Sequence, residues 1–531
     1  MHTSLCLVNG RICTLDQHQP WAEAVLTQGH RISFVGSSAA ARSLAGSSAR
    51  LVDLEGRLVL PGLIDNHVHF IQGGLHLQGI DLRHCSSSEA FVARMQEYVA
   101  THRGKWISGG DWDQERWPVK KLPRKEWLDE FSEDTPIFLQ RFDGHMGVAN
   151  SLALRLAGIS GSSPQPQGGL IEKDPSTAEP TGILKDTAMS FVYSVIPPLT
   201  FEERRRAALV AMEEARKSGI TSVQDITAPE DLEVYRNLET EGKLTCRLYT
   251  RLPIQEYQQL VRDGIQRGHG SRFLKLGSLK AFADGSLGSG TALFFDPYED
   301  EPTNRGLAMD IVTNGNLRRW ALEADRHRLQ LSVHAIGDRA IDMILSLFEE
   351  IVATNPSWDR RFRIEHGQHV RSEDLPRFAG LGVVVSGQPY HAVDDGVWAE
   401  SRVGSRRVQM TYPFRSYIDS GVCVCFGSDW TVAPLNPLLG LSAAVTRRTL
   451  DGKHPGGWVP RQKVSVVDAV RCYTINNAYA AFEEEVKGSL ERGKLADMVV
   501  LDRDIFSIPP EEIETAGVDM TILDGRIISG L

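Results

Sequence analysis

The sequence has no long hydrophobic run and no signal-peptide pattern near its start. None of its apolar stretches approaches the roughly 18 residues that suggest a membrane-spanning helix. The opening residues, MHTSLCLVNG, lack the basic start and long apolar segment of a secretory signal. We therefore expect a cytoplasmic protein that does not act at a membrane.

Cysteine and concentrated positive charge are also scarce. The seven cysteines are scattered and odd in number, which does not suggest a disulfide framework. Cys423 and Cys425 alternate within GVCVCFG, and we expect them to be buried strand thiols. The formal charge of -10 and the lack of a Lys/Arg stripe argue against a nucleic-acid surface. The expected partner is a small molecule.

Both ends of the 531-residue chain contain short apolar strands separated by turn signals. Residues 1–60 include turns at Asn9-Gly10 and Glu55-Gly56, and residues 481–531 repeat this style around Asp524-Gly525. Two β-rich ends around a large middle predict one discontinuous β-sandwich accessory domain, built from 1–60 and 481–531.

The middle of the chain, residues 61–480, alternates strand-like and helical segments. For example, FEERRRAALVAMEEARKSG predicts a helix with Thr200 as its N-cap and Gly219 at its end, and ITSVQDI follows as a strand. Such alternation predicts an α/β fold, and its length fits a (β/α)8 TIM barrel. Residues 71–190 depart from the pattern and are expected to form a large insertion after barrel strand 1.

The stretch PGLIDNHVHF, residues 61–70, ends a buried apolar run with two histidines. Side chains two positions apart in a strand point to the same face, so His67 and His69 could both contact one bound group, such as a metal ion. Taken alone, the pair is more typical of a coincidence at a strand end than of a metal site.

Further polar residues follow other predicted strands, where barrels of this type carry their catalytic groups. They are Lys280 in LKAFADG, His334 in LSVHAIGD, His366 in RIEHGQH and Asp429 in CFGSDW. Imidazoles and a carboxylate suit Zn2+ or a similar divalent ion, which activates water and polarises a carbonyl oxygen. An aspartate beside it can carry the proton from water to a leaving amine.

These motifs resemble the amidohydrolase superfamily, in the branch of YtcJ-like and N-substituted formamide deformylase-like enzymes. The resemblance runs from about residue 5 to 530 and preserves the order of the motifs. The matching stretches are PGLIDNHVHF, RFDGHMGVANSLAL, GGLIEKDPSTAEPTGIL, LKAFADGSLGSGTALF, SVHAIGDRAID, RIEHGQHV, FGSDWTVAPLNP and GSLERGKLADMVVLDRD. It implies a metal-dependent (β/α)8 barrel with a split β-sandwich that hydrolyses C–N bonds, and it makes a homodimer plausible.

The resemblance also implies roles for individual residues. It implies metal ligation by His67, His69, His334 and His366 and, for Asp429, both ligation and general base and acid catalysis. Lys280 matches a lysine thought to be carbamylated by CO2, which would make it an anionic ligand. Both one-metal and two-metal versions remain open, with Zn2+ as the expected ion.

Several residues have a second interpretation. Lys280 could instead pair with Asp284, and the strand period places Glu365 on the side away from the metal, in a structural role. The remaining candidates are possible substrate contacts that could equally serve packing or loop hydrogen bonding: His145, Trp112, Trp430 and His391.

The predicted activity is hydrolysis of a non-peptide amide or N-substituted formamide by metal-activated water, with Asp429 as base and acid and with possible help from His334. A cyclic-amide hydrolase or heterocycle deaminase would use the same site, and release of ammonia from heterocycles would distinguish it. A non-catalytic scaffold is the remote alternative, which the presence of every expected ligand disfavours.

Overall fold

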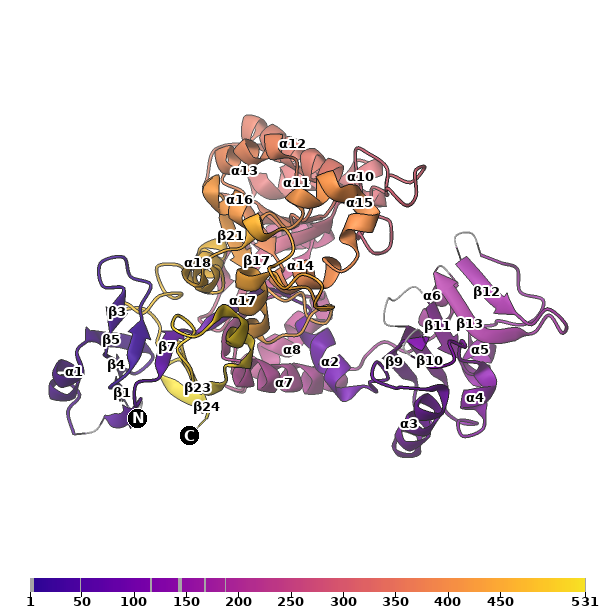
Figure 1. Cartoon of the computed structure of the whole chain (residues 1–531), viewed down its shortest axis with the longest axis horizontal. Helices are drawn as coiled ribbons and strands as arrows, with labels where there is room; N and C mark the ends of the chain where they lie inside the picture. Colours follow the sequence, from indigo (N-terminus) through magenta and orange to yellow (C-terminus); the bar gives the residue numbers. More distant parts are fainter. Residues whose placement is uncertain are drawn as a thin grey trace. The chain divides into compact units, whose positions relative to one another are not determined.

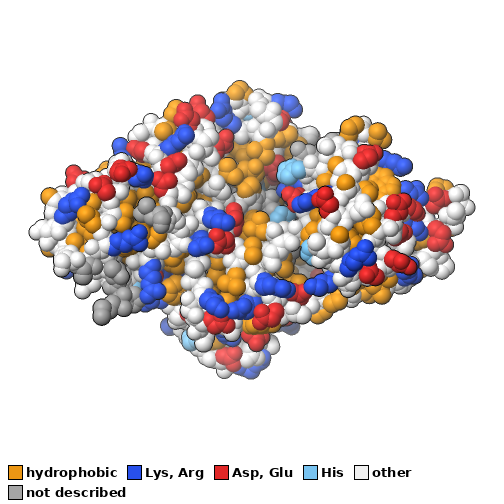
Figure 2. Space-filling view, turned by 90° about the horizontal axis from the view of Figure 1, so that it is seen from below, with side chains coloured by type: hydrophobic (Ala, Val, Ile, Leu, Met, Phe, Trp, Pro, Cys, Tyr) orange, Lys and Arg blue, Asp and Glu red, His pale blue; other side chains and the backbone are white. Residues whose placement is uncertain are grey.

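The computed structural model describes residues 4–47, 49–114, 117–141, 146–166, 169–186 and 188–530. They divide into two compact units, one made of 1–71 and 211–531 and the other of 72–210. Within the described part of the chain, no helix is long and apolar enough to cross a membrane. On the face shown in Figure 2, acidic and basic side chains are intermingled.

The first unit is built around an eight-stranded parallel sheet. Its strands β17 and β21 are labelled in Figure 1. In spatial order its strands are β21 (Cys423–Phe426), β20 (Val384–Gly387), β19 (Arg363–His366), β18 (Gln330–Ala335), β17 (Leu274–Phe282), β15 (Arg247–Pro253), β14 (Ile220–Ile226) and β8 (Leu63–Val68), with β16 (His269–Gly270) pairing antiparallel to β17. These strands are almost entirely buried, as expected for a parallel sheet covered by helices.

The two ends of this sheet meet. A parallel bridge joins Val68 to Trp430, just beyond β8 and β21. The backbone N–H of Asp429 donates to the carbonyl of His67 at 2.7 Å, and that of His69 donates to Trp430 at 2.8 Å. The sheet is thus nearly closed and is consistent with the predicted (β/α)8 barrel.

Helices separate the barrel strands along the chain. They are α7 (Phe201–Lys217), α8 (Pro229–Thr240), α9 (Tyr257–Arg262), α10 (Asp310–Thr313), α11 (Asn316–Arg326), α12 (Asp338–Thr354), α13 (Leu375–Leu381), α14 (Pro389–Asp395), α15 (Ala399–Arg407) and α16 (Phe414–Asp419), followed after β21 by α17 (Pro437–Thr446), α18 (Val466–Cys472) and α19 (Ile475–Ala480).

The start of α7 shows how the sequence sets a helix boundary. Thr200 Oγ1 accepts from the N–H of Glu203, and the Glu203 carboxylate accepts from the N–H of Thr200, which forms a capping box. Gly219, just after the helix, has a φ of +75°, a conformation that glycine adopts without strain. The predicted helix, its cap and strand 220–226 are confirmed.

The chain ends contribute two further sheets to the first unit. One has the order β5 (Arg31–Gly36), β4 (Ala24–Gln28), β1 (Leu5–Val8), β6 (Arg50–Asp53), with α1 (Ser38–Leu44) after β5 in the chain. The other has the order β24 (Arg526–Ser529), β23 (Val518–Leu523), β22 (Met498–Leu501), β7 (Leu58–Pro61), β2 (Arg11–Cys13), β3 (Trp21–Ala22).

Strands from opposite ends of the sequence pair in the second of these sheets. β22 runs antiparallel to β7, with Val500 opposite Val59, and one buried core joins Leu7 and Val59 to Val500 and Ile522. Since both sheets fall within the same compact unit as the barrel, a separate sandwich domain stays a prediction.

The second unit, residues 72–210, lies in the chain between β8 and β14 and follows the start of α2 (Phe70–Gln78). Its mixed sheet has the order β12 (Gly169–Lys173), β13 (Pro180–Asp186), β11 (Met146–Ala149), β10 (Ile137–Arg141), β9 (Ile107–Trp112). Its other helices are α3 (Ser88–Thr101), α4 (Lys125–Asp129), α5 (Ser151–Leu156) and α6 (Met189–Tyr193).

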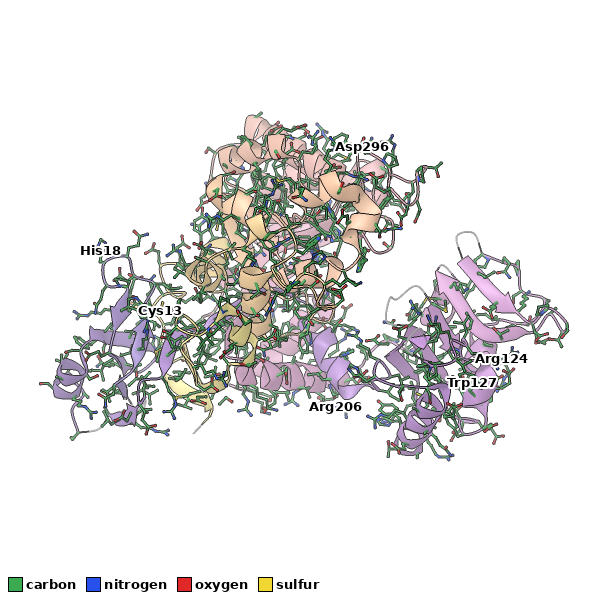
Figure 3. The ribbon with its side chains drawn as sticks, in the orientation of Figure 1. Cys13, His18, Arg124, Trp127, Arg206 and Asp296 are labelled. Carbon is green, nitrogen blue, oxygen red and sulfur yellow. The ribbon has the colours of Figure 1, made fainter. Side chains whose placement is uncertain are left out.

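All seven cysteines are free thiols. Cys13, which lies on β2 (Figure 3), is buried, as are Cys6, Cys246, Cys425 and Cys472. Cys425 lies in β21, and burial is the main reason that the pKa of its thiol is raised well above the ordinary value. The expectation of buried strand thiols holds for Cys425, whereas Cys423 is only partly buried.

Candidate metal centre

Five barrel strands bring the predicted polar residues to one edge of the sheet. His67 lies in β8, Lys280 in β17, His334 in β18 and His366 at the end of β19, and Asp429 follows β21. Because these strands are parallel, their carboxyl ends meet at the same edge of the sheet.

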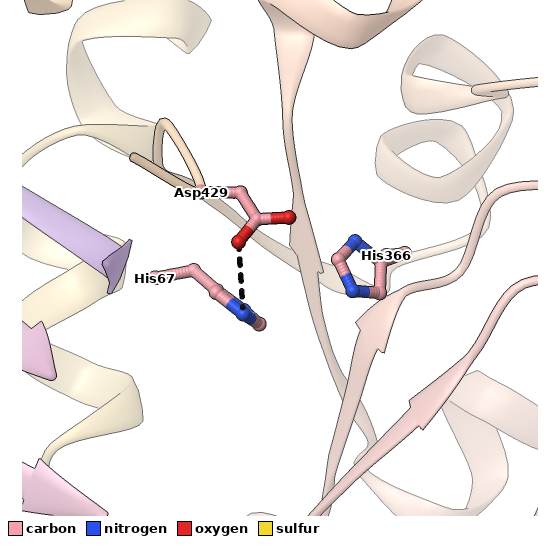
Figure 4. A group of neighbouring side chains, drawn as sticks. All are labelled: His67, His366 and Asp429. Atoms are coloured by element: carbon pink, nitrogen blue, oxygen red, sulfur yellow. Dashed lines mark ion pairs between the residues drawn. The ribbon is translucent and has the colours of Figure 1, made fainter. Parts of the chain in front are cut away.

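Three of these side chains converge closely (Figure 4). His67, His366 and Asp429 each offer one ligand atom, and these atoms all lie within 4.8 Å of one another. Nε2 of His67 is 3.6 Å from Oδ1 of Asp429, and the rings of His67 and His366 are 5.1 Å apart. All three residues are buried. Two imidazoles and one carboxylate are ligands that suit Zn2+.

Two of the three have an unusual backbone conformation. The φ angles of His366 and Asp429 are +70° and +57°, in the left-handed region that residues other than glycine seldom adopt. At His366 this conformation interrupts the alternation of side chains that β19 would otherwise continue. Backbone strain of this kind is common at functional sites.

The interruption overturns one expectation. We predicted that Glu365 points away from the metal, but its carboxylate lies inside the barrel, with Oε2 2.5 Å from Nδ1 of His67. The prediction was wrong because it assumed that strand alternation continues through His366. Glu365 is fully buried.

The hydrogen bonds leave a suitable nitrogen on each histidine. Nδ1 of His67 is occupied by Glu365, and Nδ1 of His366 is 2.8 Å from Oε1 of Gln388. Metal-binding histidines commonly use one ring nitrogen for the metal and the other for such a partner. His67 and His366 therefore fit a divalent metal through Nε2, together with the carboxylate of Asp429.

Burial keeps the histidines neutral. It is the largest influence lowering the pKa of His67 to about 3 and that of His334 to about 4, with the nearby Lys280 acting in the same direction. Burial also lowers the pKa of His366 well below its ordinary value. Neutral imidazole is the form that binds metal, so no proton competes with an ion near pH 7.

The other two predicted histidine ligands are adjacent to this group. Nε2 of His69 is 3.4 Å from Oδ1 of Asp429, and its side chain is 38% exposed. The ring of His334 packs edge-on against His366 at 4.5 Å, but its Nε2 donates to the carbonyl of Gly285 at 3.0 Å. The structure thus brings His69 to the group, while Nε2 of His334 already has a protein partner.

Lys280 is a buried amine that has no hydrogen-bond partner among the described residues. Its Nζ lies 4.7 Å from the centre of the Phe282 ring. Burial, the largest influence, lowers the pKa of Lys280 to about 7. The alternative pairing with Asp284 is not observed, because that carboxylate accepts the backbone N–H groups of residues 293, 336 and 337. A neutral amine near pH 7 is the form that can react with CO2.

The four predicted substrate contacts lie in different surroundings. His391, in α14, has a buried Nε2 for which the described part of the chain offers no hydrogen-bond partner, and its ring lies 6.5 Å from that of His366. Trp430 follows Asp429 directly and is 6% exposed. Trp112 is fully buried in the core of the second unit, where its indole N–H donates to Leu139. His145 lies outside the described residues.

Two further polar residues at this edge were missed. Gln388, which follows β20, holds His366, and Asp65, in β8, accepts the N–H groups of His67 and Ser428. Burial raises the pKa of Asp65 to about 7. Gln388 carries the same signal as the predicted residues, a polar side chain after an apolar strand, within GVVVSGQPYH.

Sequence comparison identifies the family of this chain. A sequence profile described as "Amidohydrolase family" matches residues 50–529. The chain belongs to the amidohydrolase family. The resemblance seen in the strand-end motifs is confirmed.

Several known proteins align with nearly the whole chain. Protein LONG AFTER FAR-RED 3 of Arabidopsis thaliana is 38% identical, over 98% of this chain and 91% of its own length. N-substituted formamide deformylase of Arthrobacter pascens is 29% identical, over 98% and 97%. The crystal structure of an uncharacterized metal-dependent hydrolase from Pyrococcus furiosus, 30% identical, superposes with a TM-score of 0.80, over 95% of this chain and 100% of that one.

Proposed function

We propose that this amidohydrolase family member is a metal-dependent hydrolase of a non-peptide C–N bond, in an amide or N-substituted formamide. The convergence of His67, His366 and Asp429 within 4.8 Å carries the proposal. The names of two relatives support it, because one is an N-substituted formamide deformylase and the other a metal-dependent hydrolase.

The donor set suits one or two divalent ions, with Zn2+ as the expected metal. His67, His366 and Asp429 would hold the ion, with His69 next to them. Lys280, if carbamylated, would add an anionic oxygen ligand. When bound, such an ion lowers the pKa of water and polarises a carbonyl oxygen.

The residues around the ion would then handle protons and the substrate. Asp429 would accept the proton of the attacking water through its carboxylate and later deliver it to the nitrogen of the leaving amine. His334, beside His366, would donate a hydrogen bond to the substrate carbonyl by exchanging it for the bond that its single N–H makes to the carbonyl of Gly285. His391 and Trp430 are the proposed substrate contacts, because both flank the group of ligands.

A metal-exchange experiment tests this function. Protein purified without chelator should contain zinc or a similar ion and should hydrolyse members of a panel of N-substituted formamides and acyclic amides. Removal of the ion should abolish hydrolysis and its return should restore it. An active protein free of metal would refute the proposal, and release of ammonia from heterocycles would redirect it toward a deaminase.

A pair of histidine variants locates the ion. His366→Ala should lose metal and activity together. His369→Ala is the matched control, since His369 is also buried but its Nδ1 binds Thr411 at 2.9 Å. Loss of metal from both variants to the same extent would remove the assignment of His366 as a ligand.

A further inference from the structure

Glu365 lies at the centre of a buried hydrogen-bonding network inside the barrel. Its Oε2 is 2.5 Å from Nδ1 of His67 and 2.9 Å from Nη1 of Arg251. Its Oε1 accepts from Oγ of Ser332 at 2.7 Å and from Nε of Arg363 at 3.0 Å. None of these five residues is more than 1% exposed.

The network occupies the acceptor positions of the Glu365 carboxylate. A carboxylate has about four acceptor positions, and these four donors occupy them, so none remains for a metal ion. Glu365 therefore acts through His67 and does not touch the ion or the substrate. Of its four partners, only His67 is a candidate ligand.

The two arginines make Glu365 a permanent acceptor. The guanidinium groups of Arg251 and Arg363 each lie within hydrogen-bond distance of the Glu365 carboxylate, at 2.9 Å and 3.0 Å, and these two cations hold it in its ionised form. An ionised carboxylate cannot donate, so the proton of the hydrogen bond belongs to Nδ1 of His67. Nε2 of His67 then keeps its lone pair and faces Asp429.

The same arginines fix the backbone next to His67. Nη2 of Arg251 donates to the carbonyl of Asn66 at 3.1 Å and to that of Gln224 at 2.9 Å. Nη2 of Arg363 donates to the same Asn66 carbonyl at 3.0 Å. Arg251 and Arg363 thus hold both the carboxylate that orients the ring and the peptide that precedes it.

We propose that Glu365, held by Arg251 and Arg363, is a positioning residue that fixes the tautomer and orientation of His67 and thereby sets the affinity of the centre for its metal. The inference rests on the proposed function, because it requires that His67 bind a metal. Partners of this kind typically contribute about 10-fold to 100-fold to metal affinity.

Zinc affinity, measured by competition with a chromophoric chelator, tests the proposal in the full-length protein. Glu365→Gln removes the charge, and Glu365→Asp keeps the charge near the arginines but shortens the reach to His67. Both variants should bind Zn2+ about 10-fold to 100-fold more weakly than the wild type. Folded variants that bind Zn2+ as tightly as the wild type would overturn the positioning role.

A matched control separates positioning from general loss of stability. Asp325 is buried and receives Nε of Arg360 at 2.8 Å and Nη2 at 3.1 Å. None of the partners recorded for it in the described part of the chain is a candidate metal ligand. Asp325→Asn removes a comparable buried carboxylate and should leave Zn2+ affinity unchanged. An equal loss of affinity in Asp325→Asn would count against the proposal.

A crystal structure of the zinc-loaded wild type gives an answer that does not depend on how the variants fold. The ion should lie on Nε2 of His67, with Nδ1 still bound to Glu365. An ion on Nδ1, or on the Glu365 carboxylate, would overturn the inference. A wild type that binds no Zn2+ would instead refute the proposed function, so the two failures are distinguishable.

Discussion

Asp429 and His67 are joined by both backbone and side chain. The N–H of Asp429 donates to the carbonyl of His67 at 2.7 Å, and its Oδ1 lies 3.6 Å from the ring nitrogen Nε2 (Figure 4). The first bond helps to close the barrel between its first and last strands. The second contact brings together two members of the candidate metal centre, so the same two residues take part both in closing the sheet and in forming the centre.

Replacement of Asp429 by Asn should separate metal binding from catalysis. The amide keeps an oxygen near His67 but cannot accept a proton, so we expect turnover to fall by about 100-fold to 10,000-fold. Metal analysis should still find the ion in Asp429→Asn. Full activity in this variant would contradict the role of Asp429 as base and acid.

The sequence predicted the strand-end residues because two simple regularities hold in this barrel. Apolar runs become buried parallel strands, and polar residues at their carboxyl ends gather at one edge. His67, His366 and Asp429 follow both regularities and converge. The role of Glu365 could not be predicted, because the left-handed φ of His366 cannot be recognised in a sequence by its residue type.

Pairing over long distances was predictable only in outline. The β-rich ends suggested that their strands associate, but the register of β22 on β7, with Val500 opposite Val59, depends on the folded barrel between them. The hydrogen-bond partner of each histidine ring nitrogen could not be predicted from the sequence either. Only the structure shows that Nε2 of His334 is bound to Gly285.

Bicarbonate should increase the recovery of active enzyme if Lys280 is carbamylated. The buried amine, with its pKa lowered to about 7 mainly by burial, is substantially neutral above that pH and can attack CO2. Metal-free protein reloaded with Zn2+ at about pH 8 should regain more activity with bicarbonate than without it. Lys280→Ala should show no such gain.

Lys275→Ala is the control for this experiment. Lys275 lies in the same strand, β17, but its Nζ pairs with the Glu483 carboxylate at 2.9 Å. This variant should keep the bicarbonate effect. If Lys280→Ala responded to bicarbonate as the wild type does, carbamylation of Lys280 would be excluded as its cause.

Stability at acidic pH should depend on His369. Burial, with a smaller effect of Arg407, lowers the pKa of His369 to about 3, against about 6.5 in an unfolded chain. Between these values the unfolded state binds the extra proton, so the stability of the fold rises with pH and is lost as the pH falls. As the pH falls from 6.5 to about 5, this single site should lower the free energy of unfolding by about 2 kcal/mol.

The variant His369→Gln isolates this contribution. Its amide can still bond to Thr411 but does not titrate. Urea unfolding at about pH 5 and about pH 7.5 should therefore show a pH effect about 2 kcal/mol smaller than in the wild type. Equal pH effects in the two proteins would mean that His369 is not held neutral by its surroundings.

Gly427 should tolerate no side chain, because it lies against the strand that carries His67. A Cβ at this position would be 2.5 Å from Oδ1 of Asp65 and 2.6 Å from the backbone nitrogen of His67. Since β8 cannot move away without displacing His67, Gly427→Ala should lower stability by about 1–3 kcal/mol and reduce Zn2+ binding.

Gly380, in α13, is the control, because a Cβ there would meet no heavy atom within 4 Å beyond its own helix backbone and chain neighbours. Thermal unfolding and zinc titration should show lower stability and weaker Zn2+ binding in Gly427→Ala, and neither change in Gly380→Ala. Unchanged stability and Zn2+ binding in Gly427→Ala would show that β8 has room to move.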